Sequence, residues 1–409
     1  IRTPDSQNRN LMLYPTELHA LLFFNFFKEN LNILNLANLI NECIKKIFLN
    51  KLKIKNFRNH KSFGIDLEAQ RTIVLGCNGI GKSNLLESIE FLSQLKSNRA
   101  LSDKDLIEND SDMAEVIGQI DFRDDLKLNL FRKGSKKIYV NDSILRKQSE
   151  IKNFIRSVCF CSSDIGIVRN EPNYRRIWID KVVSQLEPVY LDLISRFNRL
   201  LKQRSHYWRS ESFQNDQSSE ILESFDIQMS IISTRIFRRR RRALLKIKPY
   251  VEYWHRYLSK SKEHIGINYL SGIQNISPEE EEEEVITKKI VEQLIIQRPI
   301  ESLTGKCNFG PHRDDVEFLI NNISVRKYGS SGQQRTFILA LKMAELDLLT
   351  KTLNVPPILI LDDVLAELDI TRQNLLLNSV GKDSQCFISA THLDKFNQSF
   401  LGSSQMIYL

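Results

Sequence analysis

A glycine-rich stretch at residues 75–89, LGCNGIGKSNLLESI, constrains the fold of this chain more than any other part of its sequence. The β-branched run before it, residues 71–76, is typical of a buried strand, and the apolar spacing after it is that of a helix. The loop between them contains the pattern G-x-x-x-x-G-K-[ST] and one additional glycine: Gly76, Gly79, Gly81, Lys82 and Ser83. A strand, a glycine-rich loop and a helix in this order predict an α/β fold built around a phosphate-binding loop (P-loop).

The residue types of the loop indicate a nucleotide as its ligand. Glycines let backbone N–H groups turn toward phosphate oxygens, and the start of the following helix favours negative charge. Lys82 is expected to reach the β- and γ-phosphates of ATP, and the Ser83 hydroxyl to coordinate Mg²⁺. The strand–loop–helix context disfavours the competing interpretation, a glycine-rich turn with a lysine there by chance. The predicted ATP-binding residues are Gly76, Cys77, Asn78, Gly79, Ile80, Gly81, Lys82 and Ser83.

A second segment supplies the carboxylates that a magnesium-dependent triphosphate site needs. Residues 358–363, ILILDD, place Asp362 and Asp363 at the carboxyl end of a buried strand. We expect Asp362 to hold Mg²⁺, through water, and Asp363 to polarise the water that attacks the γ-phosphate. A strand that ends in a charged turn would explain these residues alone, but their pairing with the P-loop pattern favours the magnesium site.

Composition sets broader limits. The 409 residues are 42% hydrophobic and 26% charged, which predicts a soluble chain of two or three domains. The net charge of +8 is compatible with a polyanionic partner and does not require one. The most apolar early stretch is interrupted by Lys28 and Glu29, so no membrane span is predicted. The six cysteines lack zinc-site or disulfide-framework spacing, which favours reduced thiols in the cytoplasm.

The patterns divide the chain into four segments. Residues 1–46 are interpreted as an N-terminal extension of unknown role, and 47–169 as the first part of an ATPase head, with the P-loop and a hairpin around residues 124–142. Residues 170–300 read as a helical arm, and 301–409 as the second part of the head. Two charge runs lie in the arm, arginines 238–242 and glutamates 279–284. They are interpreted as a solvated helix face and an exposed mobile loop rather than as functional sites.

The segment GSSGQQRTFILALKMAE, residues 329–345, contains the pattern Ser-x-Gly-Gln just before a predicted helix and resembles the signature of ABC-type ATPases. In that class, this helix start caps the nucleotide of a partner subunit, so two ATP molecules lie between two head-to-tail copies. The resemblance implies that Ser330, Gly332 and Gln333 contact ATP. It also implies that residues 365–369, LAELD, form the D-loop and that His392 contacts the γ-phosphate.

The spacing of the motifs narrows the class further. Lys82 and Ser330 are 248 positions apart (330 − 82), a longer interval than in transporter ATPase subunits, and the insert is helical, as in SMC-like ATPases. It is too short for their long coiled coils. The chain resembles the RecF family of bacterial recombination mediators, whose motifs are matched in order: LKIKNFRNH (52–60), the P-loop, NEPNYRRIWID (170–180), FGPHRDDVEF (309–318), SGQQRT (331–336) and LDDVLAELD (361–369).

The sequence departs from the usual pattern of the RecF family at two residues and in one short segment. Ser83 stands where the family usually has threonine, and the hydroxyl is retained. Ser331 replaces a usual glutamine, and FCSSD (160–164) replaces the family's F-S-P-E-D turn.

The resemblance implies an ABC-type, SMC-like P-loop ATPase head with mixed sheets and a helical arm. It implies ATP-dependent binding to gapped DNA, an ATP-dependent homodimer, slow DNA-stimulated hydrolysis, and action with RecO and RecR in aiding RecA. Phosphate contacts are expected from basic residues near the head surface and the hairpin: Lys53, Lys55, Arg58, Lys61, Arg132, Lys133, Lys136 and Lys137. Alternatively, Asn56, Phe57 and Arg58 lie beside the nucleotide, as the corresponding segment does in SMC-like heads. Arg313 is interpreted as an ion-pair partner of Asp314 or Asp315.

Two other functions compete with this interpretation. Another SMC-like or ABC-type ATPase with a different nucleic-acid task would carry the same site motifs. A transporter ATPase subunit would carry them too, but the long insert argues against it.

Overall fold

The structure, a computed structural model, describes residues 47–210, 219–260, 263–274, 276, 282–380, 383–394 and 396–409, which belong to one compact unit. The predicted extension 1–46 and residues 279–281 of the glutamate run lie outside the described residues. Glu283 and Glu284 of the same run form the start of a helix, so the loop interpretation is wrong for these two residues. Within the described part of the chain, no helix is both long and apolar enough to cross a bilayer. The cysteines described are all free: Cys77, Cys159, Cys161, Cys307 and Cys386.

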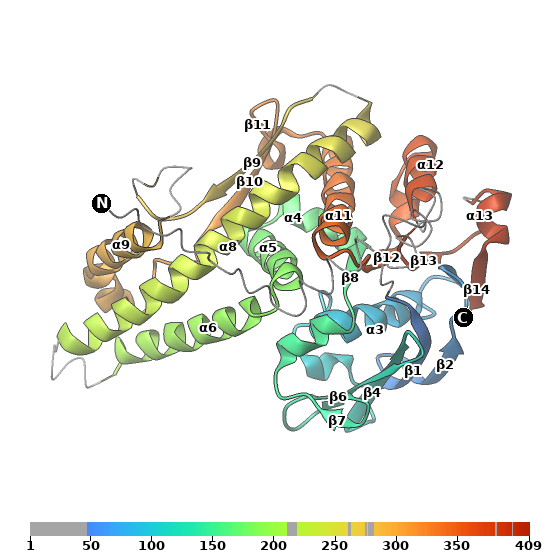
Figure 1. Ribbon diagram of the computed structural model, residues 1–409, viewed down its shortest axis with the longest axis horizontal. Coiled ribbons are helices and arrows are strands. Elements are labelled where there is room, and N and C mark those ends of the chain that lie inside the picture. The colour runs from blue at the N-terminus through green and yellow to red at the C-terminus, as the bar shows by residue number, and fades with distance from the viewer. Residues whose placement is uncertain are drawn as a thin grey trace, which may run out of the picture. The chain divides into compact units, whose positions relative to one another are not determined.

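A parallel five-stranded sheet forms the centre of the head (Figure 1). Its strands, in spatial order, are β14 (Ser404–Tyr408), β3 (Arg71–Leu75), β13 (Cys386–Ala390), β12 (Ile358–Asp362) and β8 (Ser157–Cys161). Segments far apart in the sequence therefore alternate in one sheet. Because all neighbours are parallel, the carboxyl ends of β3, β12 and β13 lie along the same edge.

The two faces of this sheet belong to two hydrophobic cores. Side chains alternate along β12, so that Ile358 and Ile360 pack in one core and Leu359 and Leu361 in the other. The first core also contains helix α3 (Lys82–Gln94) and the antiparallel sheet of the head. The second contains α5 (Pro172–Leu186), α8 (Ser219–Ser259) and α11 (Ser331–Leu353). The continuous apolar runs of the parallel strands follow from burial on both faces.

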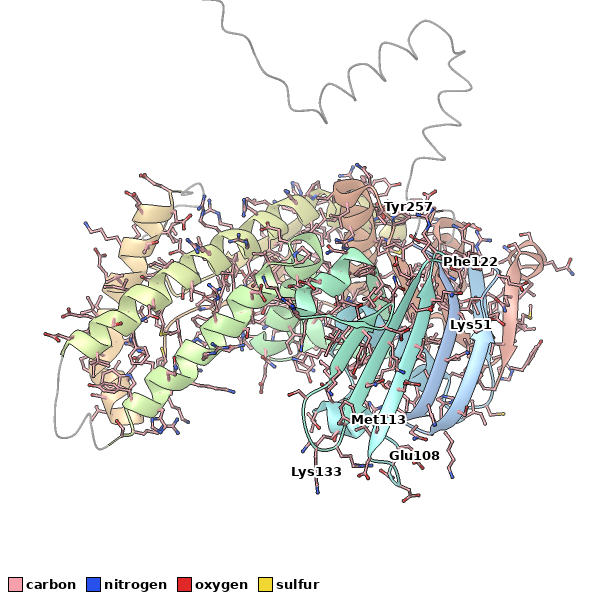
Figure 2. The ribbon with its side chains drawn as sticks, turned by 60° about the horizontal axis from the view of Figure 1, so that its bottom comes forward. Lys51, Glu108, Met113, Phe122, Lys133 and Tyr257 are labelled. Atoms are coloured by element: carbon pink, nitrogen blue, oxygen red, sulfur yellow. The ribbon has the colours of Figure 1, made fainter. Side chains whose placement is uncertain are left out.

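A six-stranded antiparallel sheet carries the predicted hairpin (Figure 2). In spatial order its strands are β2 (His60–Asp66), β1 (Leu49–Phe57), β4 (Met113–Ile120), β5 (Asp124–Phe131), β6 (Lys137–Val140) and β7 (Ser143–Ile144). In β1, Leu52 and Ile54 are buried whereas Lys53 and Lys55 are exposed. The period-two alternation of β1 thus correctly predicted one buried and one basic face. The predicted hairpin, formed by β5 and β6, is also confirmed.

Four helices occupy most of the predicted arm: α5, α6 (Tyr190–Tyr207), α8 and α9 (Glu283–Thr304). The expectation of a helical arm missed one strand, β9 (Ile265–Leu270). β9 pairs antiparallel with β10 (Asp315–Ile320), which pairs with β11 (Ile323–Ser324). The nearest residues paired between β9 and β10, Leu270 and Asp315, are 45 positions apart in the sequence. A local sequence pattern cannot reveal a pairing over this interval. The remaining short elements are η1 (Asp103–Leu106), η2 (Gln148–Asn153), η3 (Ser162–Ile165), α4 (Gly166–Arg169), α10 (Val325–Tyr328), η4 (Val364–Glu367), α12 (Ile370–Ser379) and α13 (Gln398–Gly402).

The arginine run in α8 is not a uniformly solvated face. Arg240 is only 2% exposed, and its guanidinium donates to Asp180 Oδ1 at 2.9 Å and to the Pro311 carbonyl at 2.7 Å. It also lies 3.5 Å from Asp314 Oδ2. The solvated interpretation is therefore wrong for Arg240, because the side chain supplies the counter-charge for carboxylates from two other parts of the fold.

The expected partner of Arg313 is also corrected. Asp315 pairs with Arg175 of α5 at 2.6 Å, and Asp314 faces Arg240. Arg313 instead donates to Asn308 Oδ1 at 3.3 Å. The acidic pair after residue 313 thus anchors the arm helices to β10.

A buried ion-pair cluster joins three arm helices. Arg204 of α6 is fully buried, donates to Glu301 Oε2 of α9 at 2.9 Å and pairs with Asp226 of α8. Asp226 also pairs with Arg298 at 2.6 Å, and Glu301 accepts from the Trp208 indole at 3.1 Å. Each carboxylate therefore has several donors, as buried charges require.

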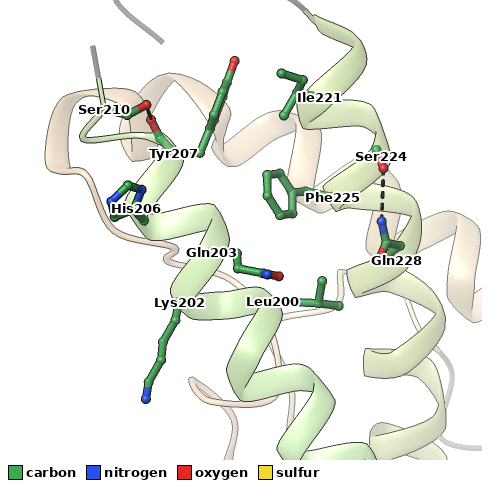
Figure 3. Close-up of a pocket in the computed structure, with 10 residues that line it drawn as sticks. All are labelled: Leu200, Lys202, Gln203, His206, Tyr207, Ser210, Ile221, Ser224, Phe225 and Gln228. Carbon is green, nitrogen blue, oxygen red and sulfur yellow. Dashed lines mark hydrogen bonds between the residues drawn. The ribbon is translucent and has the colours of Figure 1, made fainter. Parts of the chain in front are cut away.

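Close to this cluster, a pocket of about 820 Å³ lies between α6 and α8 (Figure 3). Its lining mixes apolar and polar side chains: Leu200, Lys202, Gln203, His206, Tyr207, Ser210, Ile221, Ser224, Phe225 and Gln228. Residues 211–218, which join the two helices, lie outside the described part. Beside this pocket, the Arg204–Asp226 ion pair and the neighbouring rings of Tyr207 and Phe225 connect the two helices.

Replacing Arg204 by methionine should destabilise the protein by about 3–5 kcal/mol, because Asp226 and Glu301 lose a buried counter-charge. Urea unfolding followed by circular dichroism measures the change. Arg199→Met is the matched control, since Arg199 is exposed on the same helix, and we expect a change within about 0.5 kcal/mol. Equal stability of the two variants would contradict a structural role of the cluster.

Candidate nucleotide-binding site

The P-loop lies between β3 and α3, as the sequence predicts, and its backbone requires glycine at two positions. Gly79 has φ +85° and Gly81 has φ +119°, values that residues with a Cβ rarely adopt. A Cβ on Gly81 would also lie 2.6 Å from Asn59 Nδ2. Because Gly81 directly precedes the first residue of α3, the free N–H groups of this helix begin at the loop.

Lys82 lies within the curve of this loop. Its side chain is almost buried, and its ammonium donates to the carbonyls of Gly76 at 2.8 Å and Cys77 at 3.0 Å. Among the described residues it forms no ion pair with a carboxylate. A buried positive charge with only neutral acceptors fits an anionic ligand such as a phosphate.

The turn between β1 and β2 holds the P-loop from outside. Asn59 Nδ2 donates to the Ile80 carbonyl at 2.9 Å, and Asn84 Nδ2 of α3 donates to Asn59 Oδ1 at 2.8 Å. A ring nitrogen of His60 lies 3.1 Å from the Gly81 carbonyl oxygen. Sequence analysis matched residues 52–60 to a family motif and did not identify Asn59 or His60 as supports of the loop.

The two expected magnesium ligands lie together. Ser83 Oγ donates to Asp362 Oδ1 at 2.8 Å, which joins the start of α3 to the end of β12. Burial raises the pKa of the Asp362 carboxyl, whereas hydrogen bonds from Ser83 and Ser389 and the positive charge of Arg99 act in the opposite direction. A cation at this carboxylate would offset the cost of its burial.

The oxygen ligands present fit Mg²⁺. A hydroxyl and a carboxylate are hard donors, and Mg²⁺ usually takes few protein ligands and completes its shell with phosphate and water. No cluster of three or more His, Cys, Asp or Glu residues able to hold a metal occurs in the described ranges. Magnesium coordination by Ser83 and Asp362 stays a prediction.

Asp363 follows β12 in the left-handed region, with φ +57°. Its N–H donates to Ser389 Oγ at 2.7 Å, and its Oδ1 lies 3.3 Å from the same hydroxyl, which lies 2.9 Å from Asp362 Oδ1. Ser389 thus links both acidic residues. Sequence analysis missed it because a single serine forms no motif, although its place at the end of a strand parallel to β12 was a signal.

His392 lies near the first half of the P-loop. It is exposed and lines a pocket of about 600 Å³ together with Leu75, Gly76, Cys77, Asn78, Thr391, Leu393 and Tyr408. The structure therefore brings His392 to the nucleotide-binding loop across more than 300 positions of sequence. Its contact with a γ-phosphate stays a prediction.

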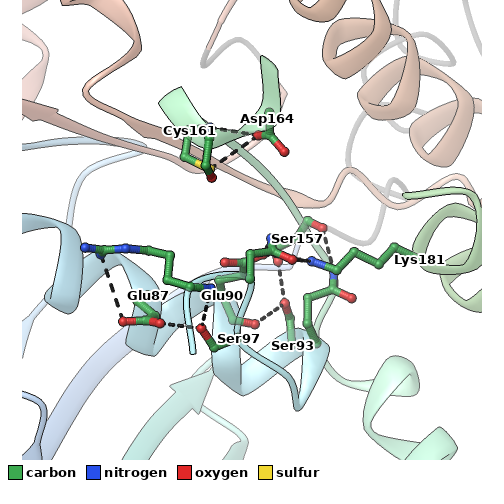
Figure 4. Close-up of polar contacts among 12 residues, drawn as sticks. Glu87, Glu90, Ser93, Ser97, Ser157, Cys161, Asp164 and Lys181 are labelled. Atoms are coloured by element: carbon green, nitrogen blue, oxygen red, sulfur yellow. Dashed lines mark hydrogen bonds and ion pairs between the residues drawn. The ribbon is translucent and has the colours of Figure 1, made fainter. Parts of the chain in front are cut away.

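Polar contacts of α3 extend from the site in two directions (Figure 4). The Arg58 guanidinium donates to both oxygens of buried Glu87 at 2.9 Å, and Ser97 also donates to Glu87. On the other side, Glu90 pairs with Lys181 of α5 at 3.3 Å. These contacts attach α3 to the β1–β2 turn and to the arm.

The basic residues expected to contact DNA fall into two groups. Arg58 is paired with Glu87, Arg132 donates to the carbonyls of Ser111 and Glu108, and Lys136 pairs with Asp103 at 3.0 Å. These contacts give the three side chains structural roles. The exposed group consists of Lys53, Lys55, Lys61, Lys133 and Lys137.

The signature segment begins helix α11 with a capping box. Ser330 Oγ accepts from the Gln333 N–H at 3.2 Å, and Gln333 Oε1 accepts from the Ser330 N–H at 3.0 Å. Gln333 Nε2 also donates to Glu263 Oε1 at 3.0 Å. Ser330 is exposed and Gly332 half-buried, and among the described residues no hydrogen bond or ion pair joins Ser330, Gly332 or Gln333 to the P-loop. The signature and P-loop of one chain are thus not connected as one site.

Comparison with known proteins agrees with the geometry. The family model of the RecF/RecN/SMC N terminal domain matches residues 48–404. The DNA replication and repair protein RecF of Parasynechococcus marenigrum (strain WH8102) is 44% identical over 355 residues, covering 87% of this chain and 97% of the relative. RecF of Cyanothece sp. (strain PCC 7425 / ATCC 29141) is 38% identical over 365 residues, with coverage of 88% and 96%.

Two solved structures of the recombination mediator protein RecF in the RecFOR pathway, RecF-ATPrS and RecF-ATP, each match with a TM-score of 0.80 and 29% identity. They cover 86% of this chain, which covers 95% and 94% of theirs. The expected fold, an SMC-like ATPase head, is confirmed. With a family-model match over most of its length and relatives of this identity, the chain is a member of the RecF family.

Proposed function

We propose that this chain is an ATP-dependent DNA-binding protein of recombinational repair and replication restart, which binds gapped DNA and aids RecA loading. The observation that carries the nucleotide part is the convergence of Lys82, Ser83, Asp362 and Asp363 at one edge of the parallel sheet. The names of the relatives, DNA replication and repair protein RecF, support the DNA-repair role.

In this proposal the loop from Gly76 to Ser83 binds the triphosphate of ATP. Lys82 exchanges its two carbonyl partners for phosphate oxygens, and Ser83 and Asp362 hold Mg²⁺, which neutralises charge on the phosphates. Asp363 accepts a proton from the attacking water, and the Ser389 hydroxyl orients this carboxylate. His392 contacts the γ-phosphate. Hydrolysis is slow and stimulated by DNA, and serves as a switch.

The exposed signature supports an ATP-dependent homodimer. The N–H groups at the start of α11 favour an anion, and Ser330 at this start is open to solvent. Two copies arranged head to tail would place each α11 start on the nucleotide of the partner. ATP then favours the dimer, because only the dimer offers these contacts.

The exposed lysines of the antiparallel sheet and hairpin supply the DNA contact. Their exposure on one sheet suits phosphate recognition independent of base sequence, with affinity that falls as salt rises. RecO and RecR are the proposed protein partners, since the similar solved structures are described within the RecFOR pathway. A cytoplasmic location stays a prediction from the cysteine pattern.

The function is tested by sizing the protein by light scattering with ATP, with ADP, and with ATP plus gapped DNA. We expect a dimer with ATP, a monomer with ADP, and a DNA-bound dimer in the third case. A binding assay with and without ATP compares gapped DNA with blunt duplex. Equal affinity for the two DNAs would contradict the gap-binding function and favour an SMC-like ATPase with another nucleic-acid task.

Asp363→Asn should retain ATP binding and ATP-dependent dimerisation but lower kcat at least about 10²-fold, because the amide cannot accept the proton of water. Phosphate release under saturating ATP measures the rate. Asp383→Asn, at an exposed position before β13, is the control and should keep the natural rate. Normal turnover of Asp363→Asn would show that another group polarises the water.

Ser330→Arg should bind ATP normally and fail to dimerise, because the long side chain blocks the approach of the partner's phosphates. Nucleotide binding is measured by fluorescence titration, and dimerisation by light scattering. Ser330→Thr keeps the capping hydroxyl and should still dimerise. If Ser330→Arg dimerises with ATP as well as the natural chain does, capping across the dimer is wrong.

A further inference from the structure

A row of arginines on α8 lines a pocket in the arm. Arg235, Arg238, Arg239 and Arg242 are spaced at i, i+3, i+4 and i+7, which places them on one helix face. They line a pocket of about 250 Å³ whose other lining residues are Val189, Leu193 and Glu283. We call this feature the arginine pocket.

The arginine pocket has more positive than negative charge. Glu283 pairs with Arg238 at 2.6 Å and lies 3.4 Å from Arg235, while Glu187 pairs with Arg239 at 2.8 Å and lies 3.6 Å from Arg242. Four guanidinium groups thus share these two carboxylates, and Arg239 also donates to the Arg235 carbonyl at 3.2 Å. Because each guanidinium carries five N–H donors, the ion pairs named here leave donors available for a further acceptor.

The four side chains remain accessible. The exposed fractions of the Arg235 and Arg242 side chains are 49% and 50%, and those of Arg238 and Arg239 are 32% and 21%. Arg240, in the same run, is buried against Asp180 and fixes the rotation of α8 at this point. The run is therefore divided between one structural arginine and a partly exposed group that faces the pocket.

We propose that the arginine pocket binds backbone phosphates of nucleic acid. Guanidinium groups bind phosphate through paired N–H donors, and the row extends about 10 Å along the helix axis. A row of this length can contact more than one phosphate of a single strand. The inference rests on the proposed function in that its ligand is the DNA of the repair reaction.

The chemistry of the pocket favours phosphate over an acidic peptide. Glu283 and Glu187 already present carboxylates to the four arginines. A peptide carboxylate would therefore replace one carboxylate by another, with no new kind of contact. A phosphodiester in a strand brings several acceptor oxygens and releases condensed counterions on binding. Glu283 and Glu187 therefore act as exchangeable counter-ions, which compete with the nucleic acid for the same donors.

This competition predicts opposite effects of two variants. Arg238→Gln combined with Arg242→Gln removes two phosphate contacts and should weaken binding to gapped DNA about 5–10-fold near 0.15 M salt. Glu283→Gln removes a competing charge and should strengthen binding about 2–5-fold. A surface that merely adds stability to the arm would not produce tighter binding on loss of its own ion pair.

The experiment measures fluorescence anisotropy of labelled gapped DNA with the full chain and ATP, between 50 and 200 mM salt. The slope of log affinity against log salt should fall in magnitude by about 2 for Arg238→Gln/Arg242→Gln. The matched control, Arg199→Gln/Arg256→Gln, removes the same charge from exposed arm positions outside the pocket and should change affinity less than twofold.

The outcomes separate the two proposals. If the natural chain does not bind gapped DNA, the proposed function fails. If it binds and both pocket variants keep its affinity and salt slope, the arginine pocket is not a nucleic-acid site, even if Arg238→Gln/Arg242→Gln loses binding to a polyglutamate peptide. Should the double variant not fold by thermal melting, Glu283→Gln decides, and unchanged or weaker DNA binding by it overturns the assignment.

Discussion

The hydrogen bond between Ser83 and Asp362 is the contact on which the rest of the site depends. It connects the first turn of α3 with the carboxyl end of β12, and the parallel register of β3, β13 and β12 brings these ends to one edge. Ser389 of β13 completes the connection by contacting both Asp362 and Asp363. The parallel sheet, buried on both faces, brings these ends together, and Asn59 and His60 support the P-loop from the β1–β2 turn.

Local sequence patterns were sufficient for the parts of the site that lie within one loop or one strand end. The glycines of the P-loop and the acidic pair after ILIL each encode their own backbone geometry, which explains why these segments were predicted. Asn59 and Ser389 could not be predicted in the same way. Each acts through a single side chain on a distant element, and only the folded sheets bring that side chain to the loop or to Asp362.

The arm shows even more strongly that local sequence patterns do not reveal contacts between distant segments. Helical periodicity predicted a helical arm over residues 170–300, yet it did not reveal β9, whose partner strand lies about 45 residues later. Nor could it assign the arginine run, because charge alone does not say which side chains turn inward. Arg240 is buried since Asp180 and Asp314 approach it from other segments, while its neighbours in the run line a pocket.

The contacts around α3 have a consequence for how ATP and DNA binding relate. The β1–β2 turn bonds to the P-loop through Asn59 and to α3 through Arg58, and β1 carries the exposed Lys53 and Lys55. On its other side α3 pairs with Lys181 of the arm. Neither the lysine-bearing strands nor the arm can shift relative to α3 without breaking a buried or half-buried polar contact. Helix α3 is therefore the element that contacts the support of the nucleotide loop, the lysine-bearing sheet and the arm together.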